Sequence, residues 1–418
     1  MTESSLKSIS PDSITGMIFA MEGMKNTVVL LNGPMGCRFY HSTTSQYLCI
    51  RPVLYLPEGE NGEKYPVDYN TLNDWFFRQE RVPCTYLDGY DYVYSTRDKV
   101  GSAMEYISAN IDFDIIAIVN SPGAALIGDN LLELAREKLG RKRVVMLESS
   151  GYSLGFDRGY SDASLAMLRQ VGMPLWKGSG TEKPGKGNKK VNLLGMSIWQ
   201  RNIQGDLEEL RRLFSLCGID VNAALCADCS FEELKKLPEA DLNVVVYPEG
   251  GLACAEYLKE ELGMPMYVCE TLPIGFAAVE KTFSDICRIL GCSFDALREE
   301  SEKARALAWY KIREIDQAYG KPKGVLFYVD GGETLERSYE AFLQNYLAMK
   351  KSSAEDAELV FSNANVISEL MIRNKHFCGI EIGLPGMGYT DLLPKTHMGI
   401  KGSLFLIEQV LNGLMSRI

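Results

Sequence analysis

The amino-acid sequence predicts an α/β protein in which parallel sheets are flanked by helices. Short apolar runs such as 28–31 and 114–120 have the length and the β-branched content of strands that are buried on both faces. Each run ends in a loop rich in glycine or serine, and a helical pattern follows. This alternation is typical of parallel sheets with helices on both faces, and it occurs in three successive units along the chain.

Composition limits the class of protein. The chain has 418 residues, of which 46% are apolar, so two or three packed domains are expected. Its 44 basic and 55 acidic residues give a net charge of −11, which argues against nucleic acid as the main partner. The first residues are polar and no apolar run has the length of a membrane span, which predicts a cytoplasmic protein. The 11 cysteines are therefore expected to be thiols or metal ligands.

Turn-rich breaks divide the chain into three expected domains. The first domain spans 1–180, and a polar, basic and glycine-rich linker follows at 181–190. The second α/β domain spans 191–320. The third spans 321–418, opens with a Lys-Pro-Lys-Gly break and closes with a helix near 403–414.

The stretch around Cys37 is the part of the first domain with the clearest chemical potential. The first strand-like run ends in the turn 32–36, and Cys37 follows directly, at the edge where open α/β sheets place their ligands. Arg38 and His41 lie within one helical turn, and neighbouring cations favour the thiolate that binds metal or attacks substrate. The alternative is a small buried hydrophobe at a tight strand–helix junction.

Several short motifs follow one another in a fixed order over nearly the whole chain. They are Gly33-Pro34-Met35-Gly36-Cys37, Leu126-Ile127-Gly128-Asp129, the loop 151–160, 191–195, 242–247, 263–265, 328–332 and 399–402. Each is weak alone, but the ordered set resembles component 1 of nitrogenase and its relatives. That wider family includes nitrogenases, cofactor-assembly scaffolds and dark-operative protochlorophyllide reductase.

The resemblance implies a fold, partners and a cofactor. The implied fold is three Rossmann-like domains around a central cleft. The implied partners are an ATP-dependent iron–sulfur reductase protein and a second component 1-like subunit, either identical or different. An intersubunit iron–sulfur cluster of the [4Fe-4S] type is expected in the first domain, and a tetrapyrrole or metallocluster in the cleft is a further option. No Gly-x-Gly-x-x-Gly or Walker pattern follows a strand, so ATP is expected on the reductase partner.

The sequence departs from the family at several ligand positions. Counting without gaps from Cys37 places the family's first cluster cysteine at Asp12. Counting from 126–129 places the third at Pro122, which has no donor side chain. The strand that carries the nitrogenase cofactor cysteine has Tyr247 instead. No molybdenum–iron cofactor is therefore expected.

Cys37, Asp12 and Cys84 are the candidate metal ligands. An iron–sulfur cluster needs about four thiolate-like ligands, and the resemblance to protochlorophyllide reductase implies that an aspartate can replace one. For Asp12 the alternative is a helix N-cap, because 10–13 precedes an apolar periodic segment. For Cys84 the alternative is a core or surface thiol. The Cys-x-x-Cys at 226–229 has either a redox or metal role or a structural one.

The loops that follow the strands are expected to line the cleft. His397, Glu249 and Tyr247 are the candidate catalytic residues, since buried acids and imidazoles can deliver protons to a reduced substrate. The candidate cofactor-binding residues are Ser121, Ser149, Ser150, Tyr152 and Asp330. Capping of the following helices is the alternative for the serine and aspartate residues.

These patterns predict an oxidoreductase subunit of a nitrogenase-like, ATP-dependent and anaerobic reductase complex. It relays electrons from the reductase partner through the intersubunit cluster to a substrate in the cleft. Two alternatives stay open: a non-catalytic scaffold or carrier for a metallocluster or tetrapyrrole, and a structural pairing subunit. The missing donors at Pro122 and Tyr247 support these alternatives.

Overall fold

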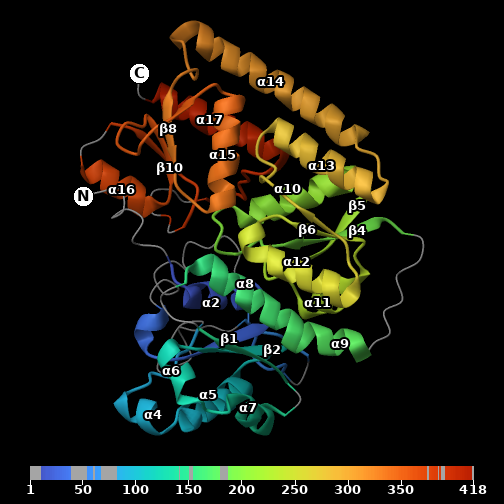
Figure 1. Ribbon diagram of the computed structural model, residues 1–418, viewed down its shortest axis with the longest axis vertical. Helices are drawn as coiled ribbons and strands as arrows, with labels where there is room; N and C mark the ends of the chain where they lie inside the picture. Colours follow the sequence, from blue (N-terminus) through green and yellow to red (C-terminus); the bar gives the residue numbers. More distant parts are fainter. Residues whose placement is uncertain are drawn as a thin grey trace.

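The computed structural model describes residues 11–38, 54–59, 62–66, 82–140, 142–149, 154–178, 187–373, 376–384, 386 and 391–416. These residues form three parallel sheets with helices around them, which confirms the predicted fold class. In Figure 1 the first sheet lies at the bottom, the second at the right and the third at the upper left.

The first sheet has the strand order β1-β2-β3, with all pairs parallel. Its strands are β1 (Thr27–Asn32), β2 (Ile115–Asn120) and β3 (Arg143–Glu148). The helices are α2 (Ser13–Glu22), η1 (Met35–Arg38), α4 (Gly89–Tyr94), α5 (Arg97–Asn110), α6 (Pro122–Ile127), α7 (Leu131–Leu139) and α8 (Phe156–Met167). Helices α2 and α8 cover one face, and α5 and α7 cover the other. Every residue of β1 and β2 is buried, as their continuous apolar runs predicted.

The second sheet has the order β5-β4-β6-β7. Its strands are β4 (Lys189–Leu194), β5 (Ile219–Ala224), β6 (Leu242–Val245) and β7 (Met266–Val268). The segment η4 (Leu168–Gly172) and α9 (Met173–Gly178) precede it. The helices are α10 (Ile203–Leu216), α11 (Phe231–Lys236), η5 (Leu237–Glu239), α12 (Pro248–Leu262), α13 (Phe276–Leu290) and α14 (Asp295–Tyr319). The predicted linker thus overlaps the first two residues of β4.

The third sheet has the order β11-β10-β8-β9. Its strands are β8 (Leu326–Val329), β9 (Lys350–Lys351), β10 (Leu359–Ser362) and β11 (Cys378–Glu381), and its helices are α15 (Glu333–Asn345), α16 (Ala364–Ile372) and α17 (Gly399–Met415). Helix α17 contacts β10 and β11 and also packs against α10, α13 and α14. It therefore joins the second and third units of the chain.

Helices α2 and α8 cross at two glycines. A Cβ atom on Gly16 would clash with the carbonyl oxygen of Phe156, and one on Gly159 would clash with the carbonyl oxygen of Ser13. The absence of side chains at both positions lets the two backbones approach closely. This crossing sets the position of the start of α8, which lies at the centre of the molecule (Figure 1).

The apolar cores are not separated by unit. One core combines Val29, Leu31 and Val119 of the first sheet with Leu194 and Val245 of the second. Another continues from the second sheet into the third. Each predicted domain holds one sheet, whereas the domain boundaries themselves remain a proposal. Among the described residues no helix combines the length and the apolar character needed to cross a membrane.

Candidate functional site

The turn that carries Cys37 leaves the carboxyl end of β1. The Cys37 N–H donates a hydrogen bond to the carbonyl oxygen of Pro34 (3.1 Å), and this bond closes the short helix η1. The Cys37 side chain is 6% exposed and lies in the same core as Ile14 and Met17 of α2. Cys37 therefore lies at the sheet edge that the sequence predicted, close to the start of α2.

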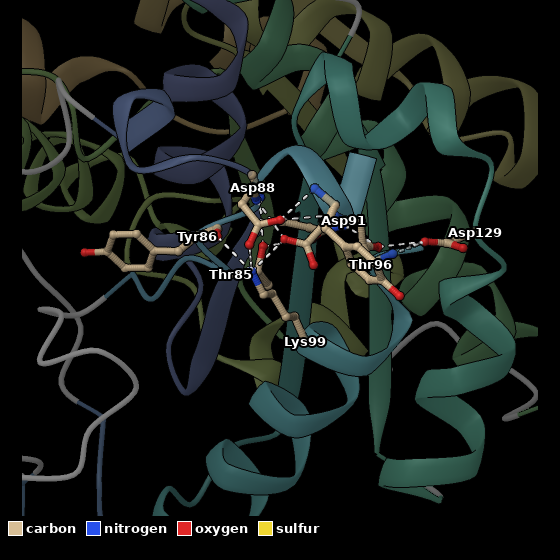
Figure 2. Close-up of polar contacts among 10 residues, drawn as sticks. Thr85, Tyr86, Asp88, Asp91, Thr96, Lys99 and Asp129 are labelled. Atoms are coloured by element: carbon tan, nitrogen blue, oxygen red, sulfur yellow. Dashed lines mark hydrogen bonds and ion pairs between the residues drawn. The ribbon is translucent and has the colours of Figure 1, made fainter. Parts of the chain in front are cut away.

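A chain of buried hydrogen bonds fixes this turn. The Gly33 N–H donates to Thr85 Oγ1 (3.0 Å), and Thr85 Oγ1 donates to Asn32 Oδ1 (2.9 Å). Asn32 Nδ2 donates to Thr96 Oγ1 (3.1 Å), and Thr96 Oγ1 donates to Asp129 Oδ2 (2.9 Å). Figure 2 shows Thr96 beside Asp129. Asp129, the aspartate of the motif 126–129, is thus connected to the Cys37 turn through Thr96 and Asn32.

A second set of contacts in Figure 2 anchors α4 beside the turn. Lys99 Nζ lies 2.6 Å from Asp91 Oδ2 and donates to the carbonyl oxygen of Tyr86 (3.1 Å). The hydrogen bond to Asp91 raises the pKa of the Lys99 ammonium. Asp88 and Asp91 form a capping box at the start of α4. The segment beside the Cys37 turn is therefore firmly positioned.

Asp12 is the N-cap of α2. Its Oδ1 atom accepts hydrogen bonds from the Thr15 N–H (2.9 Å) and from Thr15 Oγ1 (2.7 Å). Asp12 thus has the N-cap role given as its alternative, and its role as a metal ligand stays a prediction. Helix α2 packs against η1, and Ile14 and Met17 of α2 lie in the same apolar core as Cys37.

The serines predicted to bind a cofactor lie at the same edge. Ser121 caps α6 and stands against Gly33, where a Cβ atom would clash with it. Ser149 Oγ lies 3.3 Å from Ser13 Oγ. Ser150 and Tyr152 lie outside the described residues. Ser121 and Ser149 therefore belong to the edge of the first sheet and do not line the central cavity described below.

Cys84 is fully buried beside β1. The Leu31 N–H donates to the carbonyl oxygen of Pro83 (2.9 Å), and the Thr85 N–H donates to that of Leu31 (3.0 Å). The segment around Cys84 thus extends the first sheet at its edge. Its role as a metal ligand stays a prediction.

The donors at this edge do not complete a cluster site. Within the described ranges, no three Cys, His, Asp or Glu side chains are arranged to hold a metal ion. The predicted ligands Cys37 and Asp12 would be two donors, and an iron–sulfur cluster needs about four ligands. A cluster here would fit only with further donors from a partner subunit.

A central cavity of about 450 Å³ lies where the three units meet. Its lining includes Pro11, Gly155, Phe156, Asp157 and Tyr160 from the first unit, Trp199, Tyr247 and Glu249 from the second, and Asp330, Glu336, Asn363 and His397 from the third. The structure thus brings together four predicted residues from three separate regions of the sequence. These are Tyr247, Glu249, Asp330 and His397.

Two carboxyl groups of the cavity differ in their surroundings. Glu249 accepts hydrogen bonds from the N–H (3.0 Å) and the hydroxyl (2.7 Å) of Thr334. Asp157 lies in the first turn of α8 with its side chain exposed at the cavity, where partial desolvation by the surrounding protein and then the charge of Glu249 raise its pKa to about 6. Asp157 is therefore suited to exchange a proton near neutral pH. Sequence reasoning did not select it, although it lies in the motif loop 151–160.

Tyr247 and His397 differ in how they are held. Burial raises the pKa of Tyr247 well above its ordinary value, and its hydroxyl has no hydrogen-bond partner among the described residues. The His397 ring lies between Tyr339 Oη, 3.1 Å from Nδ1, and Asp206 Oδ2, 3.0 Å from Nε2. Asp206 Oδ1 also accepts hydrogen bonds from the N–H groups of His397 (3.0 Å) and Met398 (3.2 Å). Asp206 belongs to no motif, so sequence reasoning missed this role and had no signal that could have found it.

A second cavity of about 260 Å³ lies between β11 and α17, and His397 borders it too. Arg201 Nη1 lies 2.5 Å from Glu381 Oε2, and its Nη2 lies 3.0 Å from Asp391 Oδ2. These buried charges compensate one another. They connect the segment before α10 to the third unit.

The Cys-x-x-Cys segment forms a structural contact between the first two units. The Cys229 N–H donates to the carbonyl oxygen of Gly23 (3.1 Å), and its carbonyl oxygen accepts from the Lys25 N–H (2.7 Å). Both cysteines are buried, and burial raises the pKa of Cys226 to about 12. These contacts favour the structural interpretation over the redox or metal one.

Comparison with known proteins assigns the chain to a family. Residues 13–350 match the family described as nitrogenase component 1 type oxidoreductase. The chain is 28% identical over 298 residues to a component of light-independent protochlorophyllide reductase from Synechococcus sp. (strain CC9605), covering 68% of this chain and 55% of that protein. It is 27% identical over 266 residues to the same component from Halorhodospira halophila, covering 64% and 47%. The chain thus spans about half the length of these curated relatives.

A solved structure described as nitrogenase Cp1 at pH 6.5 has the same fold. It superposes with a TM-score of 0.70 at 16% identity and covers 98% of this chain and 92% of that one. The predicted fold and the predicted family resemblance are both confirmed. The chain belongs to the nitrogenase component 1 type oxidoreductase family.

Proposed function

We propose that this chain is a subunit of a nitrogenase-like, ATP-dependent reductase complex that acts in the cytoplasm. An iron–sulfur reductase protein supplies electrons, which pass through an intersubunit [4Fe-4S] cluster at the edge of the first sheet. They then reduce a substrate in the central cavity. A second component 1-like subunit completes the cluster and the complex.

The observation that carries this proposal is the direct connection between the cluster edge and the cavity. Asp12 forms an isolated β-bridge with Gly155. Gly155 lines the cavity, and so does Pro11, the residue before Asp12. Electrons that enter at the Cys37 edge therefore arrive beside the cavity wall. Membership of the oxidoreductase family supports electron transfer from this edge to the cavity.

The cavity residues fit a reduction that consumes protons. Asp157 has a pKa of about 6 and faces a cavity that also contains Glu249 and Asp330. A carboxyl group with a pKa near the working pH can donate a proton and be reprotonated. His397 is held by Asp206 and Tyr339, so it has a defined orientation beside the same cavity. We assign these groups to proton delivery and to substrate orientation.

Iron and labile-sulfide analysis of anaerobically purified protein tests the proposal. About four iron atoms per dimer are expected on the basis of one shared [4Fe-4S] cluster. The protein should be brown, and Cys37→Ser should lose the iron while Cys269→Ser, at a buried thiol away from this edge, keeps it. A colourless, iron-free protein that still binds a tetrapyrrole or a metallocluster would favour the carrier alternative instead. The analysis should be repeated with a candidate partner subunit.

Asp12→Asn separates the two interpretations of that residue. Asparagine keeps an N-cap acceptor for the Thr15 N–H, so the helix should retain its stability. A carboxamide is a poorer metal ligand than a carboxylate, so the variant should lose iron or shift the cluster's reduction potential. Asp12→Ala should additionally cost about 1 kcal/mol of stability through the lost cap. Unchanged iron and potential in Asp12→Asn would leave Asp12 with the capping role alone.

A further inference from the structure

Three carboxylates from different units form an acidic lining in the central cavity. Asp157 lies in the first turn of α8, Glu249 in the first turn of α12, and Asp330 directly after β8. Among the described residues, no lysine or arginine lines this cavity, and none forms an ion pair with any of the three carboxylates. The acidic lining, defined as Asp157, Glu249 and Asp330, therefore carries negative charge that the surrounding protein does not neutralise.

Uncharged donors hold two of these carboxylates in place. Glu249 accepts hydrogen bonds from the N–H (3.0 Å) and the hydroxyl (2.7 Å) of Thr334. Asp330 Oδ2 accepts one from Ser362 Oγ (3.0 Å). Arg337 Nη2 lies 3.5 Å from the Thr334 hydroxyl, so it contacts the donor and not the carboxylate. These contacts orient the acidic lining without compensating its charge.

His397 does not provide a compensating positive charge. It is the described lining residue that is able to become cationic, and its Nε2 atom lies 3.0 Å from Asp206 Oδ2. A protonated imidazole here would be neutralised by that carboxylate, which is buried. An anionic ligand would therefore be repelled by the acidic lining, whereas a cation would be attracted by three carboxylates at once.

An aromatic wall, formed by Phe156 and Trp199, borders the same cavity. The two ring centroids lie 5.4 Å apart, and the ring planes are tilted by 31°. Both side chains are only partly buried, so ring surface remains accessible to a ligand. Tyr247 also lines the cavity; it is 6% exposed, and its hydroxyl has no hydrogen-bond partner among the described residues. Aromatic faces attract organic cations, and the attraction is stronger where water is excluded.

The acidic lining and the aromatic wall together define a class of ligand. We propose that the substrate of the central cavity is a compact organic cation, whose apolar body lies against the aromatic wall and whose positively charged nitrogen lies among the carboxylates. A metal ion fits less well, because within the described ranges no three Cys, His, Asp or Glu side chains are arranged to hold one. The cavity volume of about 450 Å³ suits a small molecule. This inference rests on the proposed function, since it names the substrate class of the same cavity.

Binding of charge-matched probes to the anaerobically purified full-length chain tests the inference. N-Methylacridinium is a cation, acridine is neutral at pH 7.5 and acridine-9-carboxylate is an anion, and all three share one ring system. Isothermal titration calorimetry should show that the cation binds at least about tenfold more tightly than acridine, and that the anion does not bind. Benzyltrimethylammonium, a smaller cation, should displace N-methylacridinium, whereas phenylmethanesulfonate should not.

Variants place the probe in the cavity. Glu249→Gln keeps an acceptor for Thr334 and should weaken binding of N-methylacridinium by about tenfold. Glu208→Gln, which makes the same change of net charge at an exposed position on α10, should leave the affinity unchanged. Trp199→Leu should also weaken binding by about tenfold, with Trp309→Leu at an exposed position on α14 as its control. The comparison of probes on the wild type needs no variant, so a folding defect in Trp199→Leu would not obscure the result.

The outcomes separate this inference from the proposed function. Equal or tighter binding of the anion, or no binding of either cation, would overturn the inference, and so would an unchanged affinity in Glu249→Gln. The iron and labile-sulfide analysis decides the electron-transfer role independently of these titrations. A protein that contains iron and binds neither cation would refute the inference alone. An iron-free protein that prefers the cation would refute the electron relay and keep the assignment of the ligand class.

Discussion

Asp206 holds the backbone at His397 by hydrogen bonds and also lies beside its imidazole. One carboxylate oxygen accepts hydrogen bonds from Thr396 Oγ1 (2.7 Å) and from the N–H groups of His397 and Met398. The other lies 3.0 Å from His397 Nε2. A single buried side chain therefore determines the conformation of the loop that brings His397 to both cavities.

Asp206→Ala should destabilise the protein by about 3–5 kcal/mol, because each buried donor left without a partner costs about 1–3 kcal/mol. Asp206→Asn keeps an acceptor oxygen and should cost less than half as much. Urea unfolding followed by fluorescence measures the difference. Glu208→Ala, at an exposed position on the same helix, is the control and should change the unfolding free energy by less than about 0.5 kcal/mol. An equal loss in both alanine variants would contradict the assigned role.

Asp157→Asn should stabilise the folded protein at pH 7.5 and have no effect below about pH 4. The folded-state pKa of Asp157 is raised from 3.8 to about 6, so its contribution to stability is fully present below pH 3.8 and is lost as pH rises through 6. Asparagine removes the charge that causes this loss. Because the side chain also meets water in the cavity, the gain should be about 1 kcal/mol, well below the value that the full shift implies.

Unfolding measured from pH 4 to 8 checks this expectation. The stability of the wild type should fall relative to that of Asp157→Asn across the window from pH 3.8 to 6, and then remain lower. Asp162→Asn is the control on the same helix, where the partly exposed carboxylate pairs with Arg158 over 3.0 Å. That variant should not become more stable at neutral pH. If the difference in unfolding free energy between wild type and Asp157→Asn does not change with pH, Asp157 is not a proton donor near neutral pH.

At the scale of elements, the crossing of α2 and α8 links the fold to the site. The start of α2 carries Asp12, and the first turn of α8 carries Asp157. Gly16 and Gly159 allow the two backbones to touch. A change in this crossing would therefore move the cluster edge and the cavity wall together.

Gly159→Ala should destabilise the protein by about 2–3 kcal/mol, because the new methyl group would press on the Ser13 backbone, which cannot move aside freely. Gly155→Ala, four residues earlier, should be nearly neutral. Its Cβ would meet open space, and its φ of −80° suits alanine. Thermal unfolding of the two variants gives the comparison. Similar melting temperatures for both would show that the crossing tolerates a wider separation.

The strands of this fold could be predicted because burial on both faces leaves a continuous apolar pattern. The predicted runs 28–31 and 114–120 correspond to β1 and β2, and they differ by one residue at both ends of β1 and at the start of β2. The local apolar pattern also placed the last helix near 403–414, within the bounds of α17. It did not identify η4, since the π-helical turn at 168–172 follows from packing rather than from a local pattern.

The cavity could be predicted only in part. Tyr247, Glu249 and Asp330 follow strands, so their position at the sheet edges was visible in the sequence. Asp206 and Arg201 act through contacts with residues about 180–190 positions away, and no local pattern reports such pairing. The raised pKa of Asp157 depends on Glu249 from another unit, so it too required the assembled fold.

At the scale of the whole molecule, the first two units share a core that crosses the predicted linker. Trp176 of α9 is 4% exposed, and its indole N–H donates to the carbonyl oxygen of Leu234 (3.2 Å). Phe231 and Leu234 of α11 lie in the same core as the strands of the first sheet. The covalent connection at 181–190 is therefore not what holds the units together.

Splitting the chain at this linker tests that conclusion. Co-expressed fragments 1–185 and 186–418 should purify as one complex through a tag on either fragment, because the shared apolar core buries large side chains of both. Trp176→Ala removes an indole from that core and should weaken the association strongly, since loss of a buried Trp costs about 3–5 kcal/mol. Trp309→Ala, at an exposed position on α14, is the matched control and should leave the complex intact. Separation of the wild-type fragments on a sizing column would mean that the first unit folds as an independent domain, held to the rest by the linker alone.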